Sequence, residues 1–176
     1  MNAIIDWFLT WWLRTGRYGW SRLRRRMCER KYLSTALPQI STLTEIEGCL
    51  RQVMWSMDGP LHLYDSISSP ETVWARKKDD CDGFAVLASA LLWKWDPDIE
   101  PVLLTVIMRP VQQSHTVCVF SLPGEKLRVF DNASLHDEEY EAYSAVMSVI
   151  SEHKGTLVCW DVRDPETFNM IEFHKA

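Results

Sequence analysis

The first part of the chain has the apolar spacing of helices. Residues 81–95 carry apolar side chains at intervals of three and four positions, which predicts a helix with one buried face. A Thr-x-x-Glu capping pattern predicts a helix over 42–57, ended by the Asp-Gly-Pro run at 58–60. A Ser-Pro pair predicts a short helix over 69–74. We therefore expect the first half of the chain to be mainly helical.

The second part of the chain changes to the composition of strands. Runs rich in β-branched and aromatic residues occupy 100–108, 115–122, 126–130 and 156–162, and a helical pattern occupies 137–150. Helices that precede strands in the sequence are typical of α+β proteins, whose strands form antiparallel sheets. The expected fold class is therefore α+β with an antiparallel sheet.

The start of the chain differs from the rest, and we predict a helical arm over 1–35 attached to a domain over 36–176. Apolar side chains cover all but a narrow stripe of residues 2–13, and a basic helix follows. Residues 1–31 contain eight Arg or Lys and two acids, a local net charge of +6, although the whole chain has a net charge of −5. So wide an apolar face needs cover from the domain or from a partner protein. A membrane surface or a nucleic acid would also suit the basic side.

Length and cysteine content narrow the class of protein. The 176 residues suffice for one domain with its own core. Five cysteines, none in a Cys-x-x-Cys pair, match no zinc or disulfide framework, so we expect reduced thiols. The chain starts without positive charge and carries Asp6 inside its first apolar run, unlike a signal peptide. We therefore expect a cytoplasmic protein, either free or built into a large assembly such as a virion.

A predicted hairpin brings a histidine and a carboxylate together. Pro123 and Gly124 are expected at its turn, so facing residues have numbers that sum to about 247. This register places His115 opposite Asn132 and beside Asp131. A bulge or a one-residue change in the loop would put the histidine and the aspartate on one face. A carboxylate that holds one imidazole nitrogen leaves the other nitrogen free to act as a base.

Cys81 is the candidate nucleophile for a Cys-His-Asp site. It stands at the predicted start of the buried helix, where unpaired N–H groups and the helix dipole stabilise a thiolate. Its neighbours Asp79, Asp80 and Asp82 oppose the thiolate by like-charge repulsion, unless they cap the helix. Their spacing matches no metal-binding loop, so we assign them to capping and expect no metal and no other cofactor. Activation of the thiol would then come mainly from His115.

Spacing alone leaves a structural role open for each of these residues. The candidate histidine could simply be an exposed residue at a strand end. Cys118, three positions further along the same strand, should point to the opposite face and pack in the core. We predict packing roles for Cys28, Cys49 and Cys159 as small apolar residues. The other histidines, His62, His136, His153 and His174, belong to no recognisable pattern, and we predict that they lie at the surface.

Three motifs occur in an order that is specific to one protein family. They are "LYDSISSPETVWARKKDDCDGFAVLASALL", "SHTVCVF" and "LRVFDNAS", and the match extends over residues 50–135. In this respect the chain resembles the transglutaminase-like cysteine protease superfamily, and in particular the bacterial transglutaminase-like cysteine proteinases. The resemblance implies a papain-like core whose central helix begins at the nucleophile and packs on an antiparallel sheet. It also implies Cys81 as nucleophile, His115 as general base and Asp131 as the orienting acid.

Two residues depart from the family pattern. Asp79 stands where the family usually has glycine, and Gly83 stands where a second acid often follows the cysteine. Some relatives that clip bacterial adhesins draw calcium dependence from those acids, so calcium dependence is not expected here. The arm lies outside the match, and the resemblance implies nothing about it.

The function that follows is a cysteine peptidase or amide hydrolase that acts on a protein or peptide through an acyl-thioester intermediate. The same site with an amine acceptor would make a cross-linking transglutaminase. A different class of function is a structural or adaptor subunit that kept the fold inside a larger assembly such as a phage virion, with the arm bound to a partner protein.

Overall fold

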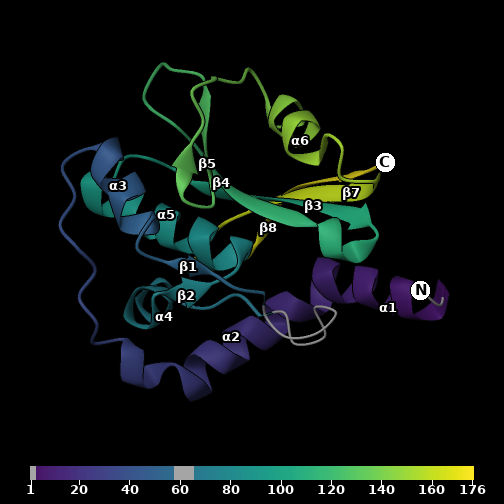
Figure 1. The fold of residues 1–176 in the computed structure, drawn as a ribbon, viewed down its shortest axis with the longest axis horizontal. Helices are drawn as coiled ribbons and strands as arrows, with labels where there is room; N and C mark the ends of the chain where they lie inside the picture. Colours follow the sequence, from purple (N-terminus) through teal and green to yellow (C-terminus); the bar gives the residue numbers. More distant parts are fainter. Residues whose placement is uncertain (1–2, 58–65) are drawn as a thin grey trace.

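The computed structural model describes residues 3–57 and 66–176, with side chains from residue 7 onward. A single six-stranded sheet carries helices on both faces (Figure 1). The predicted helix end at 58–60 lies outside the described residues, as do the first three letters of the longest family motif. Within the described part of the chain, no helix has the length and apolar character required to cross a membrane.

The helices on one side of the sheet come early in the chain. They are α1 (Ala3–Trp11), α2 (Arg17–Cys28), α3 (Leu43–Leu50), α4 (Pro70–Arg76) and α5 (Cys81–Trp95). A π-helical turn, η1 (Trp12–Gly16), joins the first two, and a 3-10 turn, η2 (Arg30–Tyr32), follows the second. Two short strands, β1 (Met54–Trp55) and β2 (Lys78–Asp79), form a separate parallel pair.

The main sheet comes from the second half of the chain. Its strands are β3 (Val102–Arg109), β4 (His115–Ser121), β5 (Leu127–Asp131), β6 (Ser134–Leu135), β7 (Thr156–Arg163) and β8 (Met170–Lys175). They lie in the order β6-β5-β4-β3-β7-β8, and every neighbouring pair is antiparallel. A 3-10 turn, η4 (Val111–Gln113), joins β3 to β4, and α6 (Tyr143–Ser151) precedes β7. The predicted α+β class with an antiparallel sheet is therefore confirmed.

Helices cover the sheet as two layers, with α5 and α3 on one face and α6 on the other (Figure 1). Alternation along the strands explains this arrangement, because successive side chains point to opposite faces. Leu103 and Cys118 belong to the core under α5, whereas Leu104 and Val117 belong to the core under α6. The predicted helix at Cys81–Trp95 is confirmed, including its packing on the antiparallel sheet.

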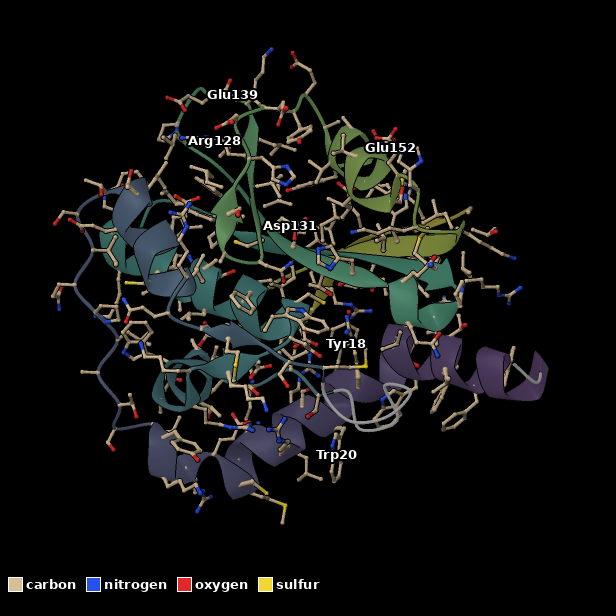
Figure 2. All side chains as sticks on the ribbon, viewed as in Figure 1. Tyr18, Trp20, Arg128, Asp131, Glu139 and Glu152 are labelled. Atoms are coloured by element: carbon tan, nitrogen blue, oxygen red, sulfur yellow. The ribbon has the colours of Figure 1, made fainter. Side chains whose placement is uncertain are left out.

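The arm packs on the same face of the sheet as α5. Its contacts lie near the last residues of β3, around Ile107. Leu9 and Leu13 are fully buried against Ile107 and two neighbouring residues of the sheet end. Figure 2 shows Tyr18 on the side of α2 that faces the sheet and Trp20 on the side that faces away. The domain therefore buries one apolar stripe of the arm.

A second stripe of the arm stays exposed. Its large apolar side chains are Trp7, Phe8, Trp11, Trp20, Leu23 and Met27. The arm's arginines turn mostly to the domain: Arg22 donates to the Thr167 carbonyl, and Arg25 donates to the Ser68 carbonyl at 2.6 Å. The arm is thus attached by polar and apolar contacts along its length and still presents an apolar surface.

Two helices are shorter in the structure than predicted, each at one end. Thr42 caps α3 as expected, accepting the Glu45 N–H at 3.2 Å, but the helix ends at Leu50 and not at residue 57. The chain instead forms β1, which pairs with a strand more than twenty positions away. Likewise α6 begins at Tyr143 and not at residue 137, because the preceding segment pairs with Leu127 through Tyr140. Pairing with distant strands explains both differences.

Candidate active site

Cys81 is the first residue of α5, and its neighbours explain why the helix begins there. Asp80 has extended backbone angles and acts as the N-cap, accepting the Asp82 N–H at 3.3 Å. Gly83 matters because a Cβ at this position would collide with the carboxyl group of Asp79. The Asp79 carboxyl group thus occupies the space of a side chain at 83. The thiol of Cys81 lies partly exposed at a helix N-terminus, a position that favours a thiolate.

His115 and Asp131 meet across β4 and β5. His115 begins its strand and Asp131 ends its own, and His115 Nε2 lies 2.7 Å from Asp131 Oδ1. The observed register pairs Cys118 with Phe130, one residue away from the predicted register. In this register the histidine and the aspartate are diagonal neighbours on one face, and the predicted pairing of His115 with Asn132 is wrong.

The loop between the two strands causes the shift in register. Pairing stops at Ser121 and Leu127, so five residues separate the strands where a two-residue turn was predicted. Inside this loop the Glu125 N–H donates to the Leu122 carbonyl at 2.9 Å, and Gly124 has a φ of +78°. This is the geometry of a type II turn, which requires a positive φ at its third position. The predicted turn residues are correct, but the loop around them is longer.

The contact with Asp131 defines which nitrogen of His115 can act as a base. A carboxylate accepts hydrogen bonds and does not donate them, so Nε2 of His115 carries the proton that points at Oδ1. The other nitrogen, Nδ1, then has a lone pair available to take a proton. Asn132 donates a second hydrogen bond to the same carboxylate oxygen at 3.0 Å. The carboxylate is thereby held in place for its contact with the ring.

The surroundings of Asp131 lower its pKa. Partial burial alone would raise the pKa of Asp131, but the hydrogen bond with His115 and the nearby ring of His136 outweigh this effect. The positive charge of Lys154 lowers the pKa further. Nε2 of His136 lies 3.9 Å from the second carboxylate oxygen. Asp131 is therefore ionised at neutral pH, as a group that orients a histidine must be.

The lowered pKa of Asp131 predicts a pH dependence of stability. The folded-state pKa lies below the ordinary value of 3.8, so the ionised form contributes stability that is complete above that value and is lost as the pH falls through the folded-state pKa. We expect the free energy of unfolding to decline more steeply below about pH 4 in the wild type than in Asp131→Asn. Denaturant unfolding between pH 2 and 7 measures it, and equal slopes in the two proteins would contradict the prediction.

Cys81 and His115 line the same cleft. Its volume is about 410 Å³, and Trp55, Met57 and Lys154 also contribute to its walls. The structure therefore places the predicted nucleophile and the predicted base at one cavity, with Asp131 behind the base. Trp55 reaches the cleft because β1 pairs with β2, the strand that leads into Cys81.

The three aspartates around Cys81 are the group of described residues close enough to share a cation, with oxygen atoms within 4.8 Å of one another. Their carboxyl groups already have other contacts: Asp80 caps the helix, and Asp82 pairs with Arg17 Nη1 at 3.4 Å. The arginine opposes a bound cation by like-charge repulsion. We therefore assign these acids to capping and ion pairing.

The other cysteines have mostly the predicted packing roles. Cys118 is fully buried with its Sγ 3.3 Å from the Ser89 hydroxyl, and burial raises the pKa of its thiol to about 12. Cys49 and Cys159 are also buried, which confirms their predicted roles. Cys28 is exposed, so the prediction that it packs is wrong.

The prediction for the remaining histidines is partly wrong. His136 is mostly buried, with Nδ1 2.8 Å from the Tyr140 hydroxyl. His174 is exposed as predicted and stacks on a tryptophan of β7. His153 is exposed as predicted, and His62 lies outside the described residues. No motif in the sequence marks His136 as a neighbour of the site, because its contact with Asp131 depends on the turn into β6.

Comparison with known proteins yields structural likeness at low identity. No protein-family model and no curated protein matches the chain. Calcium-bound LapG of Legionella pneumophila aligns with a TM-score of 0.48 and 17% identity, over 75% of this chain and 66% of that chain. The EGTA-treated form aligns with a TM-score of 0.47 and 15% identity, over 75% of this chain and 69% of that chain. The chain thus spans slightly less than two thirds of the calcium-bound protein. With TM-scores below 0.5, function has to be inferred from the chain's own residues.

Proposed function

We propose that the protein is a cysteine peptidase or amide hydrolase that uses Cys81, His115 and Asp131. One observation carries the proposal. His115 lines a cleft together with a partly exposed thiol at a helix N-terminus, and the far nitrogen of its ring is held 2.7 Å from a carboxylate. This arrangement leaves Nδ1 as the proton acceptor for the thiol. The family resemblance assigns the same three residues.

The proposed reaction has two stages. Nδ1 of His115 takes the thiol proton, and the sulfur of Cys81 attacks the carbonyl carbon of an amide. Backbone N–H groups at the start of α5 stabilise the negative oxygen of the tetrahedral intermediate. The imidazolium then gives its proton to the leaving amine, and an acyl-thioester remains. Water, deprotonated by the same nitrogen, attacks the thioester and releases the acid and the free thiol.

The cleft fits an extended segment of a protein or peptide. Trp55 and Met57 have 55% and 43% of their surface exposed, and they offer an apolar wall beside the reacting sulfur. Gln112, Gln113 and Lys154 also line the cleft and can provide polar contacts. A substrate with an apolar side chain near the scissile amide would match these walls. An amine that resolves the thioester in place of water would give a cross-linked product.

Labelling with iodoacetamide tests the proposed site. We expect Cys81 to be alkylated faster than the exposed Cys28 at pH 6–7, and the His115→Ala substitution to lower its rate by about tenfold. His174→Ala, at a histidine outside the cleft, serves as the matched control and should leave the rate unchanged. Mass spectrometry of the labelled peptides gives the rate for each thiol. Equal rates for Cys81 and Cys28 in the wild type would rule out the proposed thiolate.

The exposed stripe of the arm supports a second role, in which the enzyme is held in a larger assembly. Trp7 and Met27, near the two ends of this stripe, have 65% and 70% of their surface exposed. Exposed apolar side chains in such a row are typical of surfaces that bind another protein. Replacing both residues with serine should abolish co-purification with that partner and leave the alkylation rate of Cys81 unchanged.

A further inference from the structure

The arm contributes a buried cation to the surroundings of Cys81. Arg17, the first residue of α2, has 3% of its surface exposed. Its Nη1 lies 3.4 Å from Oδ2 of Asp82, whose carboxylate is equally buried. Asp82 follows Cys81 directly in the chain. A residue 64 positions before the thiol thus pairs with the acid next to the thiol.

The same arginine also contacts β3, the strand next to β4, which carries the proposed base. Its Nη2 donates to the Thr105 hydroxyl at 3.2 Å, and that hydroxyl lies 3.0 Å from the hydroxyl of Thr116. Thr116 is the residue after His115. A small cavity of about 10 Å³ is lined by Arg17 together with Cys81 and His115. Arg17 therefore pairs with the acid next to Cys81 and is linked, through two threonine hydroxyls, to the residue after His115.

The charges around the thiol show why a cation is needed. Asp79, Asp80 and Asp82 come from its own segment, and like charges so close to a thiol disfavour the thiolate. The other titratable or charged groups facing the cleft are His115 on β4, with Asp131 behind it, and His153 and Lys154 on the turn after α6. From the arm comes Arg17, which pairs with the buried Asp82.

We propose that Arg17 is a positioning residue through which the arm completes the active site. By pairing with Asp82 it cancels one of the negative charges beside Cys81. Through its bond to Thr105 on β3, whose hydroxyl contacts that of Thr116, it also helps to hold the start of β4, where His115 lies. This inference rests on the proposed function. It implies that the thiol is reactive near neutral pH when the arm is docked, and that a change in arm docking changes the activity.

The test is the pH dependence of Cys81 alkylation in Arg17→Met. We expect the pH of half-maximal rate to rise by about one unit, so that the rate at pH values well below the midpoint falls about tenfold. Arg22→Met is the matched control: Arg22 lies on the same helix and also binds the domain, but its hydrogen bond goes to the Thr167 carbonyl, away from the cleft. Its midpoint should equal that of the wild type.

Substitutions at Asp82 separate the charge of Arg17 from a merely structural role. Asp82→Asn alone should lower the midpoint, because Arg17 then stands beside the thiol without its acid. The double variant Arg17→Met with Asp82→Asn should return the midpoint to the wild-type value, which a purely structural defect would not do. Asp82→Asn also keeps the test valid if Arg17→Met fails to fold.

The alkylation experiments can contradict either the proposed function or the role of Arg17, and the two results differ. If Cys81 of the wild type is no more reactive than Cys28, the proposed function fails. If Cys81 is reactive in the wild type but its midpoint is the same in Arg17→Met, or in Asp82→Asn, the proposed function stands and the role of Arg17 is overturned.

Discussion

The Asp161→Asn variant should have a free energy of unfolding about 3–5 kcal/mol below that of the wild type. Asp161 is 2% exposed, and its Oδ2 lies 2.7 Å from Nε of Arg163, which is also buried. Loss of the carboxylate leaves the guanidinium charge buried without an acid at that nitrogen, and such a charge costs several kcal/mol. The effect should be large because the same guanidinium group joins the sheet to the arm.

The contacts of Arg163 show this joining role. It donates to the carbonyl of Phe168 at 3.0 Å and to the carbonyl of Arg14, at the arm, at 3.1 Å, and it lies over the ring of Tyr18. Denaturant unfolding followed by circular dichroism measures the loss. Glu166→Gln, an exposed acid in the loop after the same strand, is the control and should change stability by less than about 0.5 kcal/mol. An equally small change in Asp161→Asn would show that the buried pair contributes little.

The second large effect is expected for Leu13→Ala. Leu13 is 2% exposed and packs with Leu9 against Ile107 at the end of the sheet. Removal of a buried leucine side chain costs the transfer free energy of its carbons and leaves a cavity, about 2–5 kcal/mol in total. The arm would loosen from the domain at the same time, since these leucines supply its apolar contact.

Trp11→Ala provides the matched comparison for the arm. Trp11 lies two positions away on the same helical segment but has 46% of its surface exposed, so its removal should lower stability by less than about 1 kcal/mol. Thermal or denaturant unfolding of the two variants measures the difference. If both substitutions are equally mild, the arm is not part of the cooperative fold. If Trp11→Ala costs as much as Leu13→Ala, the solvent-facing stripe has a structural role.

Local patterns in the sequence predict the central helix and the proximity of His115 to Asp131. The start of α5 follows from a cap at Asp80 and an apolar period that begins after it, and both depend on nearby residues. The contact between His115 and Asp131 could be foreseen because a short hairpin relates its two strands by simple counting. The register was wrong by one residue because a type II turn inside a five-residue loop has the same Pro-Gly signal as a two-residue turn.

Contacts between distant segments were not predictable from the sequence. The pairing of Arg17 with Asp82 joins residues 65 positions apart, and no periodicity in the arm distinguishes this arginine from its neighbours. The structure contains the short strand β1, whereas the sequence pattern predicts a helix there. Its partner strand β2 comes much later in the chain, so local patterns do not indicate the pairing. The last strand, β8, is not recognisable in the sequence because its alternation of apolar and polar residues is short and contains many polar residues. In each case the partner residue or strand is distant in the sequence and comes close only in the folded chain.

The collision between a side chain at 83 and the carboxyl group of Asp79 has a consequence for how this sequence can evolve. The two residues differ together from the pattern of the family that the chain resembles, and the contact explains why they are linked. An acid added at 83 while Asp79 is kept would overpack the start of α5, at a cost of about 1–3 kcal/mol. Replacement of Asp79 by glycine before the change at 83 avoids this collision, so the less costly order of the two substitutions begins at 79.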